Sequence, residues 1–257
     1  MRIHHLNCGT MSMGVVDHCI LVDTGAGLVL VDTGYGLGCV RDPGRMIGPA
    51  RYALGAKLIE HETAIRQIEA LGYDLADVRD IIVTHLDLDH AGGLADFPHA
   101  TVHVHGPELR AVTEPKTLSE RLRYRKQQWS HEPKWLVNET GGGTDWFGFR
   151  AVRDLPGLPS EILVVPLPGH TRGHVGVAVD TGNGWLLHAG DAFYLGSEID
   201  PVRPHTPLLW RLYETGAIVP RAYHENRRRL VELNRAHGSE ITIFCSHDPS
   251  AFRRLSA

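Results

Sequence analysis

The chain has 257 residues, of which 42% are hydrophobic and 22% are charged, proportions that exclude a disordered protein. Its formal net charge of -4 provides no basic field and argues against a nucleic-acid partner. No stretch is long and apolar enough to span a bilayer, and the first residues contain no signal-peptide core. We therefore expect a cytoplasmic protein with no membrane partner.

Four cysteines are present without any CxxC spacing, and they lie in or beside apolar runs: Cys8, Cys19, Cys39 and Cys245. This pattern predicts reduced, buried thiols rather than a disulfide framework.

The first third of the chain predicts a β-hairpin and then an irregular excursion. Apolar residues at 15–22 and 28–31 flank the turn sequence Asp23-Thr24-Gly25-Ala26-Gly27. Asp32-Thr33-Gly34 ends the second run, and we interpret Asp32 as a turn former that binds nearby backbone N–H groups, not as a ligand. Residues 36–59 are rich in Gly, Pro and Arg and predict a long excursion.

A helix and a strand then lead to four potential metal ligands. Apolar spacing predicts a helix over 62–71, capped by Gly72, and residues 77–84 predict a buried strand. The ligands that follow this strand are His85, Asp87, Asp89 and His90. Imidazole and carboxylate groups suit zinc, iron or manganese, and a strand end holds them rigidly. The segment therefore predicts a metal site.

Residues 101–105 predict a short strand with His103 and His105 on one face, a pattern more common on half-exposed faces than at metal sites. We expect a surface insertion over residues 107–146, with a helix over 118–129 inside it.

Three strands in the second half also end in potential ligands. Residues 161–166 lead to Pro168-Gly169-His170-Thr171-Arg172-Gly173-His174, residues 185–188 lead to Asp191, and residues 241–245 lead to His247. Residues 175–179 and 185–188 predict a hairpin, and residues 208–233 predict a helical region. Because ligand-type residues end four strands, we expect one shared site.

Five segments occur in this order: Leu30-Val31-Asp32-Thr33-Gly34, His85-x-Asp87-x-Asp89-His90, Pro168-Gly169-His170-Thr171-x-Gly173-His174, Gly190-Asp191 and Ser246-His247. Together they resemble the metallo-β-lactamase superfamily, and the resemblance covers most of the chain. It implies an α+β fold, the four-layer αββα sandwich, in which two similar halves meet at the metal site. It also implies a single domain over residues 1–257.

The resemblance implies a ligand set for two metal ions. The first ion would take His85, Asp87 and His170, the second would take Asp89, His90 and His247, and Asp191 would bridge both. The family normally has a histidine where this chain has Asp87, and a carboxylate there shifts preference from zinc toward iron or manganese. We expect two zinc ions, with iron or manganese as alternatives and a weaker first site that His105 could complete. His174 would orient the His170 loop.

The chain length and the Asn7-Cys8-Gly9-Thr10 segment are most similar to the lactonase branch, which includes N-acyl homoserine lactonases. This similarity implies that metal-bound hydroxide opens a lactone by attack on its ester-type carbonyl. Tyr194 falls where that branch places a tyrosine near the substrate carbonyl, and Asp89 would pass a proton to the leaving alkoxide. Phe193 and Met13 are further candidates for substrate binding.

Other functions stay open at this stage. Arg221 and Arg227-Arg228-Arg229 would suit a thioester hydrolase similar to glyoxalase II, although a solvated helix face explains them equally. Asp87 favours a di-iron redox protein, and a phosphodiesterase and a non-catalytic sensor are further alternatives. In each case we expect a small-molecule ligand and a monomer or homodimer.

Overall fold

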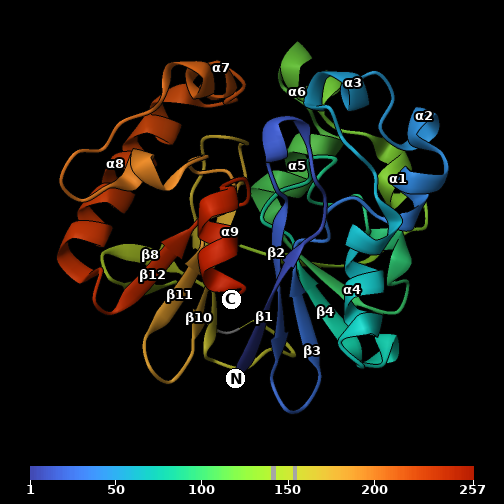
Figure 1. The fold of residues 1–257 in the computed structure, drawn as a ribbon, viewed down its shortest axis with the longest axis horizontal. Coiled ribbons are helices and arrows are strands. Elements are labelled where there is room, and N and C mark those ends of the chain that lie inside the picture. Colours follow the sequence, from blue (N-terminus) through green and yellow to red (C-terminus); the bar gives the residue numbers. More distant parts are fainter. Residues whose placement is uncertain (140–142, 153–154) are drawn as a thin grey trace. The chain divides into compact units, whose positions relative to one another are not determined.

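The computed structural model describes residues 1–139, 143–152 and 155–257. The chain divides into two compact units, each built around a β-sheet (Figure 1). The first unit comprises residues 1–104, 121–136 and 249–257, and the second comprises the described residues of 105–120 and 137–248. The stretch 107–146 therefore contributes to both units, and its residues 140–142 lie outside the described part of the chain.

A six-stranded sheet forms the first unit. Its order is β1 (Arg2–Asn7), β2 (His18–Asp23), β3 (Leu28–Val31), β4 (Val78–Ile82), β5 (Thr101–His105) and β6 (Lys134–Asn138). β2 and β3 pair antiparallel, which confirms the predicted hairpin, whereas β3, β4 and β5 are parallel. Because parallel strands end at the same edge of a sheet, the residues that follow β3 and β4 are neighbours there.

Short helices surround this sheet. They are α1 (Leu37–Arg41), α2 (Pro43–Met46), α3 (Ala50–Leu54), α4 (Ala64–Ala70) and α9 (Pro249–Leu255), and the 3₁₀ turns are η1 (Ser12–Gly14), η2 (Glu60–Glu62), η3 (Leu75–Asp77), η4 (Leu94–Asp96) and η5 (Lys126–Trp129). Both α4 and α9 contact β1 (Figure 1). α4 is the predicted helix, and Gly72 follows it with a φ of 83°, the left-handed conformation that ends helices.

The expectation of one helix over 118–129 is wrong. α6 (Leu118–Arg123) ends at Arg123, and η5 is a separate turn. The side chain of Gln128 donates a hydrogen bond to the carbonyl of Leu88, 40 residues away. Such a tertiary contact outweighs the modest local preference for a continuous helix.

The second unit contains a four-stranded sheet in the order β12 (Ile241–Phe244), β11 (Trp185–His188), β10 (Val175–Asp180) and β9 (Ile162–Pro166). The hairpin of β7 (Thr144–Trp146) and β8 (Phe149–Ala151) continues to β9 through a bridge between Val152 and Val164. β10 and β11 form the predicted hairpin, whereas β11 and β12 are parallel. The residues that follow β11 and β12 therefore leave the sheet at one edge.

Helices α5 (Gly106–Thr113), α7 (Arg211–Glu214) and α8 (Pro220–His237) belong to the second unit, with turns η6 (Gly196–Ile199) and η7 (Leu208–Trp210). α8 packs against β12 (Figure 1). The predicted helical region over 208–233 is confirmed, and it consists of η7, α7 and α8 with a break between residues 214 and 220. Proline disfavours a helical conformation in the residue before it and suits the first helical position, so α8 begins at Pro220.

All four cysteines are free and buried, which confirms the predicted burial. Burial raises the pKa of the Cys8, Cys19 and Cys245 thiols, and it raises that of Cys39 to about 12. These thiols therefore stay protonated near neutral pH and are poor nucleophiles.

Within the described ranges, no helix is both long and apolar enough to cross a membrane.

Asp96 joins η4 to the excursion, because its carboxylate accepts the backbone N–H of Leu37 at 2.8 Å. Burial raises the pKa of Asp96 to about 6 from 3.8, although the Leu37 hydrogen bond opposes the rise. The folded state thus holds this proton more tightly, and the associated stability is lost as pH rises from about 4 through 6. We expect the free energy of unfolding of the wild type, relative to Asp96→Asn, to fall by about 1–3 kcal/mol over this range.

Urea unfolding at half-unit pH intervals measures this difference. Asp77→Asn, which changes an exposed carboxylate, is the control. An unchanged difference between the wild type and Asp96→Asn would contradict the prediction.

Candidate metal centre

Four predicted ligands follow β4 in the first unit. His85 and His90 are fully buried, and their ring centroids lie 3.9 Å apart. Nε2 of His85 lies 3.3 Å from Oδ2 of Asp87. Asp89 is 8% exposed, and its Oδ1 lies 4.0 Å from Nε2 of His90. The structure thus gathers these imidazoles and carboxylates in the segment immediately after one strand.

Asp32 orients both histidines. Its Oδ2 accepts hydrogen bonds from Nδ1 of His90 at 2.9 Å and from Oγ1 of Thr84 at 2.7 Å. Oγ1 of Thr84 also lies 2.9 Å from Nδ1 of His85. Because the threonine hydroxyl donates its hydrogen to Asp32, it accepts one from His85. This network places a proton on Nδ1 of each imidazole, so Nε2 is the atom that each presents to a metal.

The interpretation of Asp32 as a local turn former is wrong. Its carboxylate is 1% exposed and accepts the backbone N–H of Thr84, which lies 52 residues away. Asp32 has a φ of 57°, a left-handed conformation that aspartate tolerates better than most residues. The neighbouring Thr33 donates from its N and its Oγ1 to the carbonyl of His90, both at 2.8 Å. The Asp-Thr pair therefore fixes both ends of the ligand segment.

Asp87 has a partner that the sequence did not reveal. Nε and Nη2 of Arg123 donate to Oδ1 and Oδ2 of Asp87, each at 2.5 Å. The two side chains are only 15% and 13% exposed. No local pattern connects residues 36 positions apart, so only the fold reveals this ion pair.

The other three predicted ligands gather in the second unit. Asp191 follows β11, and His247 follows the parallel strand β12. Nε2 of His170 lies 3.4 Å from Oδ2 of Asp191, and Nε2 of His247 lies 3.2 Å from its Oδ1. One carboxylate thus faces two imidazoles through different oxygens. This arrangement would allow the carboxylate to serve two metal ions, one through each oxygen.

Two residues support His170 and Asp191. Nδ1 of His170 lies 3.0 Å from the hydroxyl of Tyr194, so Nε2 is again the atom for a metal. Nδ1 of His174 donates to the carbonyl of Leu167 at 3.0 Å, and its Nε2 accepts the backbone N–H of Asp191 at 2.9 Å. Both nitrogens of His174 are thereby used, which confirms that His174 orients the loop.

Sequence reasoning missed Glu108, which holds the loop after His170. This glutamate is 1% exposed and accepts hydrogen bonds from Oγ1 of Thr171 at 2.6 Å and from the backbone N of Gly173 at 3.1 Å. A Cβ on Gly173 would lie 2.0 Å from the backbone N of Glu108, so only glycine allows this approach. A glutamate in the first turn of α5 gives no sequence signal for such a role.

Three further residues are candidates from the sequence: two for substrate binding and one as an alternative metal ligand. Phe193 is 1% exposed and belongs to the hydrophobic core of the second unit, where it packs with core residues such as Leu230. Substrate contact by Phe193 stays a prediction. Met13 is 64% exposed, on turn η1. His105 is buried rather than half-exposed, and its Nδ1 bonds to the carbonyl of Gly173 at 2.9 Å.

The spacing of the ligand atoms tests whether these residues fit a metal. Two ligands of a tetrahedral zinc ion at about 2.0–2.2 Å lie about 3.3–3.6 Å apart. The imidazole–carboxylate separations of 3.3 and 3.4 Å fall in this range and that of 3.2 Å lies just below it, whereas the Asp89–His90 separation of 4.0 Å is wider. The donor types and most of the spacings therefore fit zinc or a similar divalent ion.

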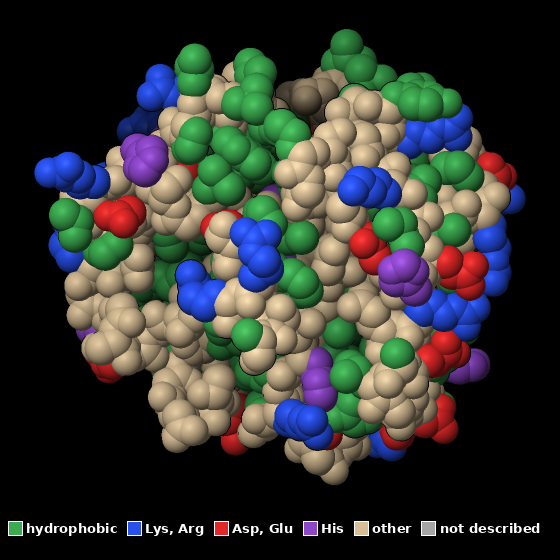
Figure 2. All heavy atoms as spheres, in the orientation of Figure 1, with side chains coloured by type: hydrophobic (Ala, Val, Ile, Leu, Met, Phe, Trp, Pro, Cys, Tyr) green, Lys and Arg blue, Asp and Glu red, His purple; other side chains and the backbone are tan. Residues whose placement is uncertain are grey.

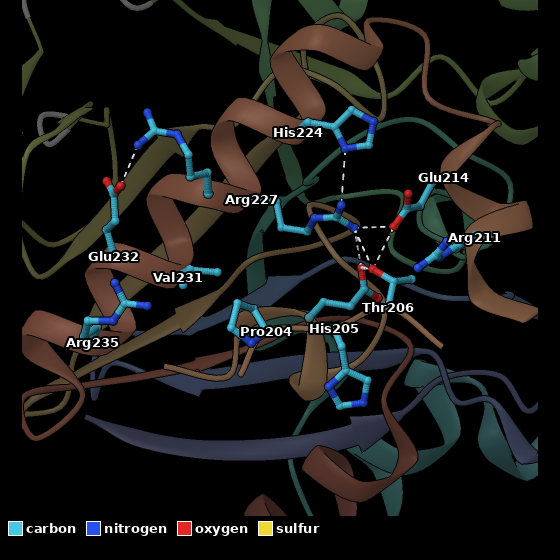
Figure 3. A pocket seen from close by; sticks show the side chains of 12 residues that line it. Pro204, His205, Thr206, Arg211, Glu214, His224, Arg227, Val231, Glu232 and Arg235 are labelled. Carbon is cyan, nitrogen blue, oxygen red and sulfur yellow. Dashed lines mark hydrogen bonds and ion pairs between the residues drawn. The ribbon is translucent and has the colours of Figure 1, made fainter. Parts of the chain in front are cut away.

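A cavity of about 710 Å³ lies beside α8 and is lined by several arginines (Figure 3). Arg227 bonds to Glu198 and Glu214, and Arg228 bonds to Glu225 and Glu232. Burial raises the pKa of Glu214, but the Arg227 and Thr206 hydrogen bonds outweigh it, so this pKa is lowered. The charges of both arginines are therefore offset within the unit, which weakens their interpretation as the basic cluster of a thioester hydrolase.

Positive and negative side chains are also mixed elsewhere. Lys and Arg lie among Asp and Glu on the face shown in Figure 2. This distribution agrees with the small net charge and provides no support for a nucleic-acid partner.

Comparison with known proteins decides the family. The model of the metallo-β-lactamase superfamily matches residues 14–230. The chain belongs to this superfamily. The buried imidazole and carboxylate clusters agree with its assignment to the metal-dependent hydrolases.

A protein of Mycobacterium tuberculosis named as a probable metallo-hydrolase is 46% identical over 257 residues, which cover 98% of this chain and 82% of that protein. The N-acyl homoserine lactonase AttM of Agrobacterium fabrum is 29% identical and matches 76% of this chain and 67% of the lactonase. The structure of an N-acyl homoserine lactone hydrolase with N-hexanoyl-L-homoserine at its metal centre has a TM-score of 0.73 and 20% identity, covering 99% of this chain and 95% of that one. This structural likeness confirms the metallo-β-lactamase fold.

Asp32→Asn should lower metal affinity by about 10–100-fold, because an amide cannot accept the Thr84 and His90 hydrogen bonds as the carboxylate does. Competition for zinc against a calibrated chelator measures this affinity. Asp74→Asn, at the N-cap of η3, provides a control that should leave it unchanged. Equal affinities for Asp32→Asn and the wild type would contradict the orienting role.

Proposed function

We propose that this protein is a metal-dependent hydrolase that opens a lactone by cleaving its ester bond. The observation that carries the proposal is the placement of Asp191, whose two oxygens face His170 and His247 separately. A carboxylate in this position suits two adjacent metal ions, which are suited to ester hydrolysis. The likeness to lactonases in sequence and fold supports the substrate class.

We further propose that the clusters of the two units are halves of one centre. One metal would be held by His85, Asp87 and His170, and the other by Asp89, His90 and His247, with Asp191 shared. Zinc fits the spacing and the imidazole content, and iron or manganese would tolerate the additional carboxylate. His105 is no longer needed as a ligand, because Asp87 lies at a suitable distance from His85.

Bound metal ions would lower the pKa of a water molecule and polarise the ester carbonyl. Asp89 is 8% exposed, so its carboxylate could accept a proton and pass it to the alkoxide that leaves the carbonyl carbon. His170 donates its Nδ1 hydrogen to the oxygen of Tyr194 when Nε2 serves the metal. The Tyr194 hydroxyl hydrogen can then point to the carbonyl oxygen of the substrate, which is the role that the resemblance to the lactonase branch implies.

The aromatic residues around Tyr194 support a substrate with an apolar part. Its ring stacks on His247 with a centroid distance of 5.9 Å, and Trp210 and Tyr213 lie 6.1 and 5.5 Å from it. These rings could hold an acyl chain beside the ligands of the second unit.

The cytoplasmic location and the choice between monomer and homodimer stay predictions, as does substrate contact by Met13.

A panel of substrates tests the function. With the purified, metal-analysed protein, pH-stat titration should show acid release from γ-lactones with and without an N-acyl chain. Glutathione thioesters and a bis-aryl phosphate should be hydrolysed at least about 100-fold more slowly. A reversed ranking would contradict the lactonase proposal, and an iron-loaded protein that consumes oxygen would favour a redox function.

Asp191→Ala should abolish both activity and the binding of two metals, because it removes the carboxylate proposed to serve both ions. Metal content by mass spectrometry and lactone hydrolysis are measured on the same preparation. Asp77→Ala, an exposed aspartate, is the matched control. Activity that survives Asp191→Ala would show that the site is wrongly assigned.

A further inference from the structure

The most unusual ligand of the proposed centre is Asp87, because the related pattern has a neutral histidine at this position. A third carboxylate adds one negative charge to a buried centre that already contains Asp89 and Asp191. Such a charge is costly to bury unless a cation accompanies it. The structure provides that cation as Arg123, whose guanidinium donates two hydrogen bonds to Asp87 in a fork.

Arg123 is held in place by the segment that carries it. It is the last residue of α6, and residues 121–136 pack within the first unit. Downstream, Gln128 donates to the carbonyl of Leu88, one residue after Asp87, and Arg125 donates to the carbonyl of Arg45. The segment that carries Arg123 is therefore bonded to the segment that contains Asp87, whose charge Arg123 offsets. The Arg123 side chain is only 15% exposed.

The fork is compatible with a metal ligand. Each carboxylate oxygen has two lone-pair sites, and the fork uses one on each oxygen. Oδ2 of Asp87 still lies 3.3 Å from Nε2 of His85, within the spacing expected for two ligands of one zinc ion. Arg123 thus fixes the rotation of the carboxylate and offsets its charge at the same time.

We propose that Arg123 is a positioning residue for the first metal, and that Asp87 and Arg123 together replace one neutral histidine. The proposal rests on the proposed two-metal function. It makes the two residues interdependent: a histidine at 87 is compatible with a metal only when the guanidinium charge at 123 is absent. A competing arrangement, in which Arg123 excludes the first metal, predicts one metal per wild-type chain.

Four proteins test this dependence: the wild type, Asp87→His, Arg123→Gln and the double variant. Each is analysed for metal stoichiometry, for zinc affinity against a chelator, and for the visible spectrum of its cobalt form. We expect two metals in the wild type and at least tenfold weaker binding of one of them in Asp87→His, because the guanidinium then lies near a cation without the Asp87 carboxylate to offset its charge. Adding Arg123→Gln to Asp87→His should restore affinity to within about threefold of wild type.

Arg125→Gln is the matched control, because it changes a neighbouring arginine of the same segment that binds a backbone carbonyl. Thermal unfolding of every variant separates a loss of folding from a loss of metal. The restoration of metal binding by a second substitution is an outcome that a purely structural role for Arg123 would not produce.

The possible failures are distinguishable. A wild type that binds no metal would overturn the proposed function itself. Two metals in the wild type with equal affinities in Asp87→His and the double variant would overturn only the role of Arg123. One metal in the wild type and two in Arg123→Gln would show that the guanidinium excludes the metal, which also overturns the proposal.

Discussion

The ligand segment of the first unit depends on one buried carboxylate, that of Asp32. This group binds the imidazole of His90 directly and that of His85 through Thr84, so a single side chain sets the tautomers of both. The interaction exists because β3 and β4 are parallel neighbours, which brings residues separated by more than 50 positions to one sheet edge. The left-handed backbone of Asp32 costs on the order of 1 kcal/mol, and the carboxylate hydrogen bonds offset that cost.

The second unit uses the same principle with different residues. β11 and β12 are parallel, so Asp191 and His247 leave the sheet together. The third proposed ligand, His170, lies on a loop that a strand end alone would not fix, and buried groups restrain it. Glu108 binds the turn after His170, and His174 links the loop to the backbone of Asp191. In both units, parallel strands determine where the ligands emerge, and buried hydrogen bonds determine which atom each one presents.

The strand ends could be predicted from the sequence, whereas the buried hydrogen bonds could not. The strand-end positions of the seven proposed ligands were visible because apolar runs stop abruptly at His85, His170, Asp191 and His247. The hairpins were predicted from apolar runs that flank glycine-containing turns, and α4 was predicted from its helical spacing of apolar residues and the glycine that follows it. The partners Asp32, Glu108 and Arg123 were missed or misread, since each acts on a residue at least 36 positions away, where only tertiary structure creates the contact.

The ion pair of Asp87 and Arg123 shows why an isolated residue is a poor guide to a metal site. Judged alone, a carboxylate in place of a histidine indicates a harder, more negative site and a different metal. Judged with the guanidinium, the same position adds no net charge, so the carboxylate alone would not turn the proposed site away from zinc. The relevant unit is therefore the pair, and its second member lies 36 positions away from the first. A chain that gains the aspartate without the arginine would face the full cost of an uncompensated charge.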